Sequence, residues 1–235
     1  MFQQSLFHLL YPNQCLHCRV LLPSDFKVLC DSCSVLLELI DSTLRCPTCF
    51  NELHEEHAFT CQECIQHPSP FYRIGSVFDY EGPASTLVKR LKYGNQPYLA
   101  KGMGSLFVAQ WHNLNWPLPD MIVPVPLSMT HWLERGYNQS ELLAQEIGKI
   151  FNRPVSKVLT RKLGDYSQAA LSMELRKTLE KTTFVLKKGS QLEGKTILLI
   201  DDVLTSGSTL RRCGEVLIEG NCGLLYGMTF CRTNL

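Results

Sequence analysis

Apolar and polar residues follow a regular order near the C-terminus, and this order predicts a strand, a loop and a helix. Residues 197–200 are four consecutive apolar positions, a short run typical of a strand buried on both faces. From residue 208 to residue 219, apolar side chains recur at helical spacing, and Gly220 follows as a stop signal. The polar residues 201–207 are therefore expected to connect a buried strand to a helix.

Further elements precede and follow this unit. The patterns predict strands at residues 71–80, 121–126 and 222–230, and helices at residues 84–92, 97–112 and 139–151. We expect an α/β fold in which helices flank a parallel sheet. In an open sheet of this kind, ligands bind just beyond the carboxyl ends of the strands.

The helix at residues 139–151 carries its own start signal. Asn138 is at the N-cap position and Glu141 follows three residues later, which is a capping-box arrangement. The expected buried stripe of this helix consists of Leu142, Leu143, Ile147, Ile150 and Phe151. Asn138 thus has a structural role, whereas Arg135 and Tyr137, in the loop beyond a strand end, are free to contact a ligand.

Four Cys-x-x-Cys pairs, separated by 11, 12 and 11 residues, mark the first part of the chain. They are Cys15, Cys18, Cys30, Cys33, Cys46, Cys49, Cys61 and Cys64. Regular spacing of this kind indicates structural zinc, one or two ions, and so small a segment needs a metal in order to fold. A different metal or cluster, a disulfide framework and redox pairs are the alternatives.

The ligand pairing stays open at this point. Sequential pairing, with residues 15–33 around one metal and 46–64 around the other, is the simplest scheme, but interleaved pairing and a single metal are also compatible with the spacing. Nearby histidines are more typical of surface residues when eight thiols are available; they are His17, His54, His57 and His67. The isolated Cys213, Cys222 and Cys231 are expected to be small buried apolar residues.

Charge divides the chain into two parts that differ in sign. Residues 1–70 contain three basic and eight acidic residues, so residues 71–235 hold 20 basic and 14 acidic ones. We place the domain boundary here: a Cys-rich, double zinc ribbon-like domain at 1–70 and an α/β domain at 71–235, with Pro68–Pro70 as the linker. The acidic domain favours a structural hood or a protein-docking role, whereas the basic domain favours phosphate ligands.

Location follows from what the sequence lacks. No apolar stretch reaches the length of a membrane span, so we expect no membrane insertion. Residues 1–11 are apolar but lack a basic region and a small-residue cleavage site; we expect a short packed helix and a cytoplasmic protein.

The loop after the 197–200 run has the chemistry of an anion site. The loop consists of four residues with hydroxyl groups and one glycine: Thr205, Ser206, Gly207, Ser208 and Thr209. The N-terminus of the next helix adds free N–H groups and the positive end of its dipole. The adjacent carboxylates of Asp201 and Asp202 suit ribose hydroxyls or Mg²⁺. A βα turn without a ligand is the alternative.

Residues 197–209 resemble the phosphoribosyl-pyrophosphate (PRPP) motif of type I phosphoribosyltransferases over the whole pattern. This resemblance implies that Asp201 and Asp202 hold the ribose hydroxyls, that residues 205–209 hold the 5′-phosphate, and that Mg²⁺ accompanies PRPP. It also implies that Lys92–Tyr93 approaches pyrophosphate, although a solvated basic helix end is the alternative. Arg135 is then expected to act with Lys92 on the leaving pyrophosphate, making Asp201, Asp202, Lys92 and Arg135 the candidate catalytic residues.

Residues 159–184 are polar, basic and long enough to form a lid over an active site. Arg161, Gln168 and Arg176 in this segment are candidates for phosphate or substrate contact, although each alone is more typical of a surface residue.

The motifs together resemble the ComF/GntX family over nearly the entire chain. They are the four cysteine pairs, a Pro-x-Pro strand end, Arg135–Gln139, a Gln-x-x-Leu segment, the PRPP motif and a terminal Cys-Arg-Thr. The resemblance implies a type I phosphoribosyltransferase-like domain behind a zinc segment, competence and DNA-processing proteins as partners, and a role in the cytosolic handling of incoming single-stranded DNA.

Two functions follow from this resemblance. The first is a competence protein with a PRPP site whose basic domain holds single-stranded DNA; aromatic residues that could stack on bases are Tyr93, Tyr98, Tyr137 and Trp132. The alternative is an active phosphoribosyltransferase that transfers ribose 5-phosphate to an unknown acceptor. Purine enzymes of this fold often read the base with a segment beyond the last strand. Here the sequence ends at Leu235, so we expect the loops or the zinc region to recognise any acceptor.

Overall fold

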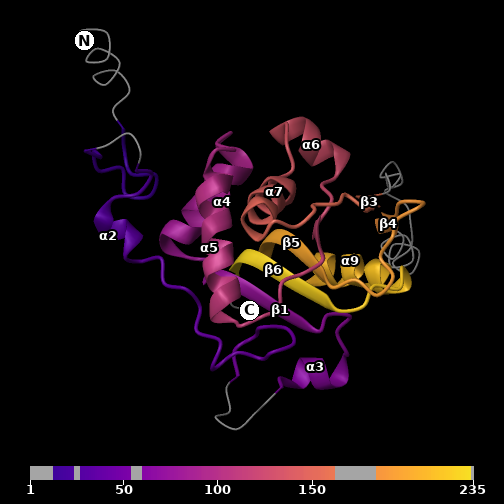
Figure 1. The fold of residues 1–235 in the computed structure, drawn as a ribbon. Helices are drawn as coiled ribbons and strands as arrows, with labels where there is room; N and C mark the ends of the chain where they lie inside the picture. Colours follow the sequence, from indigo (N-terminus) through magenta and orange to yellow (C-terminus); the bar gives the residue numbers. More distant parts are fainter. Residues whose placement is uncertain (1–12, 24–26, 54–59, 162–183, 234–235) are drawn as a thin grey trace, which may run out of the picture.

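A four-stranded parallel sheet forms the centre of the protein. The computed structural model describes residues 13–23, 27–53, 60–161 and 184–233. The strands are β1 (Arg73–Asp79), β2 (Met121–Pro124), β5 (Ile197–Leu204) and β6 (Leu225–Arg232), in the spatial order β1-β6-β5-β2 (Figure 1). Every neighbouring pair is parallel. The expected parallel α/β sheet is therefore confirmed.

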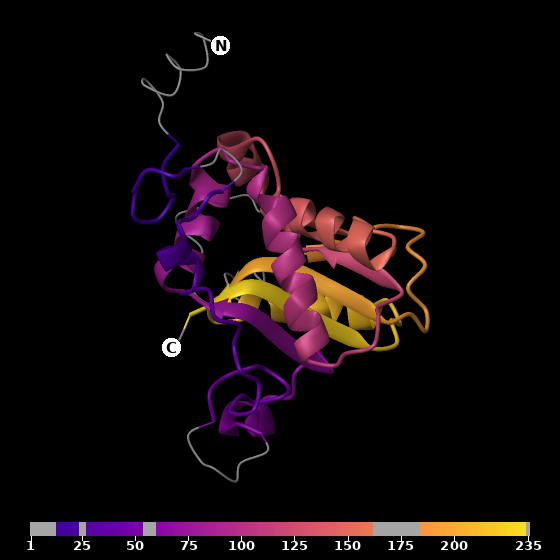
Figure 2. The same ribbon diagram turned by 60° about the vertical axis from the view of Figure 1, so that its left-hand side comes forward.

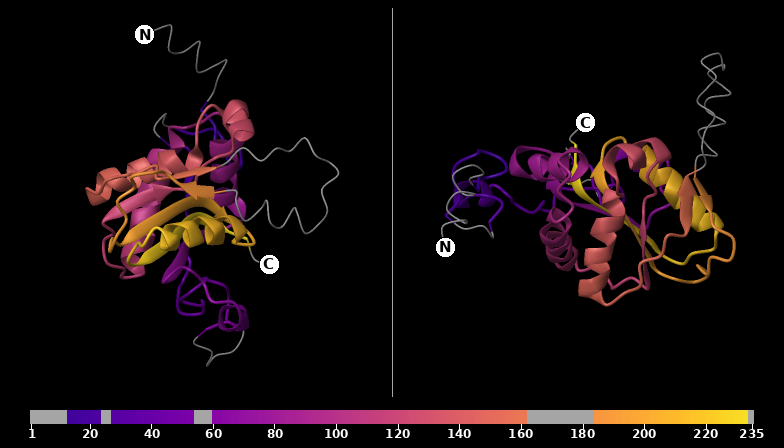
Figure 3. Two further views of the ribbon diagram at one scale, coloured as in Figure 1. Left: turned by 90° about the vertical axis from the view of Figure 1, so that its right-hand side faces the viewer. Right: turned by 90° about the horizontal axis from the view of Figure 1, so that it is seen from above.

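Helices cover both faces of this sheet. On one face lie α4 (Gly82–Tyr93), α5 (Leu99–Asn113) and α7 (Gln139–Phe151), and on the other lies α9 (Ser208–Glu219) (Figures 1 and 3). The remaining elements of the α/β part are α6 (Met129–Arg135) and an antiparallel pair, β3 (Leu159–Arg161) with β4 (Phe184–Leu186). None of the helices in the described ranges combines the length and the apolar character that a membrane crossing requires.

The central strand β5 shows why its sequence is a continuous apolar run. Leu198 and Ile200 pack into the core beneath α5 and α7, while Ile197 and Leu199 pack into the core beneath α9. All four are fully buried. A strand covered on both faces needs apolar side chains at consecutive positions rather than at alternate ones.

The ends of several elements differ from the sequence prediction. β5 continues through the two acids to Leu204, because its ladder with β6 persists to the pair Leu204–Arg232. In α7, Asn138 does accept a hydrogen bond from the Ser140 N–H, but Glu141 does not complete the expected capping box: its carboxylate binds Lys157 Nζ at 2.9 Å. Ile150, expected in the buried stripe, is 50% exposed.

The Cys-rich part of the chain is spread over the sheet domain rather than gathered in one place. α2 (Asp31–Ser34) lies beside α4, whereas α3 (Gln62–Gln66) lies below β1, and the chain between them runs along the β1 side of the molecule (Figures 1 and 2). The Ile40 N–H bonds to the Val77 carbonyl, so this connecting chain is attached to the sheet.

Contacts from Ile74, Asp79 and Arg232 attach the described part of the second cysteine module, residues 42–53 and 60–66, to the sheet. The Ile74 N–H bonds to the Thr48 carbonyl. Arg232, at the end of β6, is buried and donates to the Cys49 carbonyl at 2.9 Å and to Asn51 Oδ1. Arg45 pairs with Asp79 of β1 at 3.1 Å.

Candidate functional site

The two acids of the candidate site lie near the carboxyl end of β5 and have different partners. The Asp202 carboxylate pairs with Lys92 Nζ from α4 at 2.7 Å. Asp201 Oδ1 accepts hydrogen bonds from Ser140 Oγ, at the start of α7, and from the Asp202 N–H, both at 2.9 Å. Residues from α4, α7 and β5 thus meet at one end of the sheet, where parallel α/β folds bind their ligands.

Burial and mutual repulsion set the protonation of this group. Burial, together with the neighbouring charge of Asp202, raises the pKa of Asp201 to about 7. Burial opposes the charge on Lys92, but the Asp202 and Asp201 carboxylates outweigh it, so the pKa of Lys92 is raised. The Lys92 ammonium therefore stays charged at neutral pH and offsets part of the negative charge at the end of β5.

The loop from Thr205 to Thr209 has the geometry of an anion cradle. Gly207, at φ 71°, takes the left-handed conformation that glycine adopts without strain, and α9 begins at the next residue. Ser206 Oγ donates to Ser208 Oγ at 3.1 Å, while the four hydroxyl residues of the loop are exposed. Open hydroxyls and the free N–H groups at the start of α9 point to an anionic ligand.

Arg135 contacts Tyr93, the residue that follows Lys92 at the end of α4. The Arg135 guanidinium lies 4.9 Å from the centre of the Tyr93 ring, and its Nη2 donates to the Tyr93 hydroxyl at 3.4 Å. The Tyr137 hydroxyl donates to the Leu91 carbonyl at 2.7 Å, which fixes the α6–α7 turn against the end of α4. Tyr137 therefore has a structural contact of its own.

Gln139 and Ser140 are site residues that the sequence reasoning missed. Gln139 is 1% exposed, and its Oε1 accepts from Arg135 Nη1 at 3.1 Å. Its Nε2 and Arg135 Nε are buried and have no hydrogen-bond partner among the described residues. Gln139 belongs to the Arg135–Gln139 motif, but the only sequence signal for a ligand contact by either residue was their place at the start of a helix that follows a strand end. Two unmatched buried donors beside the carboxylates could receive acceptor oxygens of a ligand.

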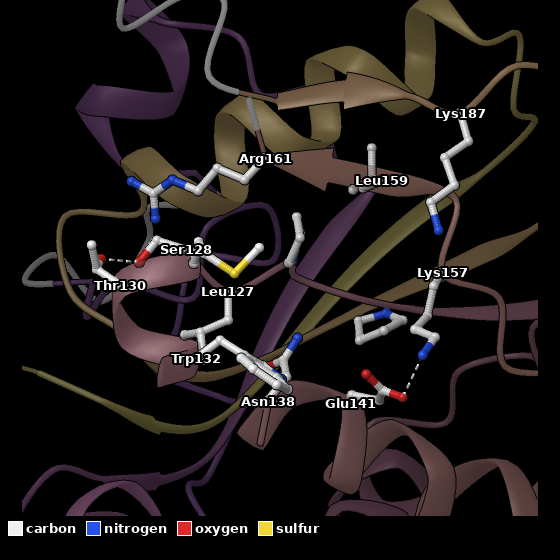
Figure 4. Close-up of a pocket in the computed structure, with 13 residues that line it drawn as sticks. Leu127, Ser128, Thr130, Trp132, Asn138, Glu141, Lys157, Leu159, Arg161 and Lys187 are labelled. Carbon is white, nitrogen blue, oxygen red and sulfur yellow. Dashed lines mark hydrogen bonds and ion pairs between the residues drawn. The ribbon is translucent and has the colours of Figure 1, made fainter. Parts of the chain in front are cut away.

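A cavity of about 460 Å³ lies between α6, the start of α7 and the strand β3 (Figure 4). Arg161 and Lys187 lie above it in the view and Trp132 and Asn138 below it. The Asp201–Asp202 pair and the 205–209 loop do not line it. Among the other candidate residues, Tyr98 is 59% exposed and takes no part in the contacts given above. Gln168 and Arg176 lie outside the residues that the structure describes.

The eight cysteines form two clusters with the sequential pairing. Cys15, Cys18, Cys30 and Cys33 make the first, and Cys46, Cys49, Cys61 and Cys64 the second; within each, the sulfur atoms lie within 4.8 Å of one another. Tetrahedral zinc with Zn–S bonds of about 2.3 Å places its sulfurs about 3.8 Å apart. The Sγ–Sγ distances of 3.6 Å for Cys18–Cys30 and 3.4 Å for Cys49–Cys61 fit that arrangement, and no cysteine is in a disulfide.

Crowding of the thiols explains why each cluster suits a cation. A hydrogen bond from Cys49 lowers the pKa of Cys46 to about 4, whereas burial raises the pKa of Cys64 to about 12. Without a metal, one thiol of the cluster is readily deprotonated, but deprotonation of the others is disfavoured. A bound dication would favour deprotonation of all four thiols. Either cluster could hold a zinc ion.

The isolated cysteines lie apart from both clusters. Cys213 and Cys231 are fully buried, as expected, and Cys222 is partly buried. Burial raises the pKa of the Cys222 thiol.

Comparison with known proteins agrees with the fold and the motifs. The phosphoribosyl transferase domain model matches residues 108–226. The "DNA utilization protein YhgH" of Escherichia coli O6:H1 is 32% identical over 228 residues, covering 94% of this chain and 98% of that protein. "Competence protein F" of Haemophilus influenzae is 30% identical over 212 residues, 87% of this chain and 90% of that protein.

Among solved structures, the glutamine PRPP amidotransferase of B. subtilis, complexed with ADP and GMP, has a TM-score of 0.44 at 16% identity, over 60% of this chain and 30% of that one. This likeness is too distant to inform the site. The full-length relatives and the domain match identify the family instead: the chain belongs to the ComF/GntX family of proteins with a phosphoribosyl transferase domain.

Proposed function

We propose that the site at the end of β5 binds PRPP. The 205–209 loop and the N-terminus of α9 hold the 5′-phosphate, and the Asp201 and Asp202 carboxylates hold the ribose hydroxyls. The observation that carries this proposal is the junction itself: two adjacent, largely buried carboxylates lead within a few residues into an exposed hydroxyl loop and a helix N-terminus. A phosphate beside a diol is the ligand that satisfies both halves.

The pyrophosphate of PRPP lies toward α4 and the α6–α7 turn in this proposal. Lys92 and Arg135 supply positive charge there, and the unmatched Arg135 Nε and Gln139 Nε2 supply donors for phosphate oxygens. Mg²⁺ travels with PRPP, since pyrophosphate oxygens and water make up most of its coordination shell. The two tetracysteine clusters hold structural zinc.

The biological setting is proposed from the relatives. Two proteins matched over nearly their full length are named for competence and for DNA utilization. We infer that this chain is a cytoplasmic competence-type protein that handles single-stranded DNA and works with other DNA-processing proteins. The net positive charge of residues 71–235 supports the DNA part, since phosphate attraction dominates non-specific DNA affinity.

Transferase turnover is the second candidate. It requires loss of pyrophosphate from the anomeric carbon and stabilisation of the positive charge that develops on the ribose ring. The Asp201–Asp202 pair is suited to that electrostatic role, and Lys92 and Arg135 to the departing pyrophosphate. The acceptor is not specified by any described contact.

Calorimetric titration of PRPP into the zinc-loaded protein, with and without Mg²⁺, tests the binding site. We expect saturable, Mg²⁺-dependent binding that Asp202→Asn weakens by at least about ten-fold, one charge-assisted contact being worth about 1.5–3 kcal/mol. Glu219→Gln, an exposed acid on α9, is the matched control and keeps full affinity. Unchanged affinity in Asp202→Asn would remove Asp202 from the site.

Release of pyrophosphate in the presence of PRPP and an acceptor panel separates the two functions. Turnover establishes the transferase. Binding without turnover, together with single-stranded DNA affinity that falls steeply with salt, supports the competence role.

A further inference from the structure

A groove of about 760 Å³ lies between the chain that follows α2 and the second cysteine module, at the N-terminal end of α4, whereas Lys92 of the candidate PRPP site lies at the other end of this helix. One wall is the chain that leaves α2, residues 36–41, and the other is the hairpin of the second module, residues 44–53, which closes through an Arg45–Glu52 bridge. The end of β1 and the first turn of α4 line the remainder. The groove is thus formed where the second cysteine module and the chain before it lie against the end of β1 and the start of α4.

The lining of this groove is strongly acidic. It contains Glu38, Asp41, Glu52, Asp79 and Glu81 against the single cation Arg45. Arg45 already pairs with two of these acids, Glu52 at 3.0 Å and Asp79 at 3.1 Å.

Three acids of the groove are left without a positive partner among the described residues: Glu38, Asp41 and Glu81, all exposed. A zinc ion held by four thiolates forms a site with a net charge of about −2, so the cysteine clusters would add negative charge near the groove when they bind zinc. The groove therefore attracts cations and repels phosphates.

Apolar side chains lie among these acids. Leu36 is 63% exposed and Leu44 is 64% exposed, while Leu39, Leu53 and Pro83 contribute more apolar surface to the lining. A groove that only bound metal ions or polyamines would have no use for exposed leucines, so the occupant carries apolar groups as well as positive charge.

Arg45 adds a third requirement. Its side chain is 8% exposed, and its Nη1 is buried without a hydrogen-bond acceptor in the part of the chain that the structure describes, although its Nη2 has two carboxylate partners. A buried guanidinium donor without an acceptor costs free energy. An occupant of the groove that supplies a carbonyl oxygen, reached by a small rotation of the guanidinium, would relieve that cost.

We propose that this groove docks a segment of a partner protein that is rich in lysine or arginine and carries intervening apolar residues. The side-chain cations of the segment face Glu38, Asp41 and Glu81, its apolar residues cover Leu36 and Leu44, and a main-chain carbonyl accepts from Arg45. A peptide is the class of ligand that meets all three demands, and nucleic acid is excluded by its charge.

This docking surface is separate from the PRPP site. The groove takes in the first residues of α4, from Gly82, whereas Lys92 and Tyr93 are the last residues of the same 12-residue helix. At 1.5 Å per residue the two ends are about 16 Å apart. Failure of PRPP binding and failure of peptide docking are thus distinguishable in the same preparation.

Fluorescence anisotropy on the zinc-loaded, full-length protein tests the proposal. The probe is a short labelled peptide in which lysine and leucine alternate, and its counterpart has glutamate in place of lysine. The groove variant combines Glu38→Gln, Asp41→Asn and Glu81→Gln. The control variant removes three exposed acids elsewhere, Glu193→Gln, Glu215→Gln and Glu219→Gln.

We expect the lysine peptide to bind the native protein and the control variant alike, the groove variant about ten-fold more weakly, and the glutamate peptide not at all. Leu44→Asn, an exposed change that leaves the charges in place, should also weaken binding. Equal affinity in the control and groove variants, or no binding to the native protein, would overturn the proposal. So would a native dimer that the groove variant dissociates, since the occupant would then be a second copy of this chain.

Discussion

At the scale of single residues, the pair Lys92–Asp202 explains how two adjacent acids are accommodated at the end of a buried strand. The Lys92 side chain is 20% exposed and the Asp202 side chain 10% exposed, so the pair is largely removed from water. Such a pair contributes little net stability by itself, but removal of one partner leaves a buried charge uncompensated.

The Lys92 cation should therefore be essential for the stability of the free protein. We expect Lys92→Met to lower the free energy of unfolding by about 2–4 kcal/mol. The double variant Lys92→Met with Asp202→Asn should recover a large part of that loss, because the uncompensated charge is then gone. Denaturant unfolding of the two single variants and the double variant measures this coupling, and purely additive effects would contradict it.

Asp201 should make stability fall as pH rises. Its pKa is about 7 in the folded protein against a reference value of 3.8, so the folded state binds the proton more tightly than the unfolded state. The stabilisation is full below about pH 4 and is lost between about pH 4 and pH 7. At about 1.4 kcal/mol per pKa unit the upper limit is about 4 kcal/mol, and solvent relaxation reduces it to about 1–3 kcal/mol.

Asp201→Asn tests this directly, because the amide keeps an oxygen for Ser140 but carries no proton equilibrium. We expect the variant to equal the native protein near pH 4 and to exceed it in unfolding free energy at pH 8. Stability curves measured from pH 4 to pH 8 decide the matter; a native protein that gains stability over the variant as pH rises would show that the pKa of Asp201 is not raised.

Sequence reasoning named the charged residues of the candidate site but not the uncharged side chains that contact them in the structure. Asp201, Lys92 and Arg135 were recognisable from the motif and its neighbours. Ser140 holds Asp201 across 61 positions of the chain, and nothing in the local pattern around Ser140 indicates a distant carboxylate. Contacts of this kind arise from the fold, so a sequence pattern of helix or strand periodicity does not contain them.

At the scale of elements, apolar periodicity located the four strands of the sheet and the helices α4, α5, α7 and α9, but it did not indicate α6 or the pair β3–β4. α9 spans the residues expected for it, Ser208–Glu219. β5 runs four residues further than its apolar run, because backbone pairing with β6 does not depend on side-chain polarity. The predicted end of β5 was therefore wrong at Asp201 and Asp202, which continue the backbone hydrogen bonding with β6 although their side chains are polar.

Close packing of α5 on α7 depends on a glycine. A Cβ atom at Gly104 would lie 2.7 Å from Glu146 Cβ, whereas a Cβ atom at Gly102, two residues earlier on the same helix, would meet nothing within 4 Å. We expect Gly104→Ala to destabilise the protein by about 1–3 kcal/mol through overpacking. Gly102→Ala is the matched control and should stabilise it by about 0.5–1 kcal/mol through helix propensity. Thermal unfolding of both variants tests the pair, and equal shifts would contradict a tight helix contact.

At the scale of the whole molecule, the spacing of the cysteine pairs predicted metal sites but not their placement. The structure puts one cluster beside α4 and the other beneath β1, and Arg232 reaches the second module from 183 positions away. The Cys-rich segment therefore extends along one side of the sheet and forms a groove where its second module meets the end of β1 and the start of α4. Contacts between residues far apart in the sequence determine this arrangement. The four cysteine pairs have the same sequence pattern, so the pattern does not show where each pair lies in the fold.

The pairing of the clusters leads to a quantitative prediction about zinc. Each cluster is built from consecutive pairs, so Cys15→Ser with Cys18→Ser should remove one zinc ion per chain and leave the other, and Cys46→Ser with Cys49→Ser should do the same. If instead the first and third pairs shared an ion, each variant would again lose one ion, but the variant that combines all four changes would keep one ion, whereas the observed pairing predicts that it keeps none. Cys222→Ser, outside both clusters, is the control and should keep the native content of two ions. Elemental analysis of the purified proteins measures the number of zinc ions per chain.

Because Arg232 and Thr48 join the second module to the sheet, loss of the zinc ion from that module should also lower the melting temperature of the whole chain.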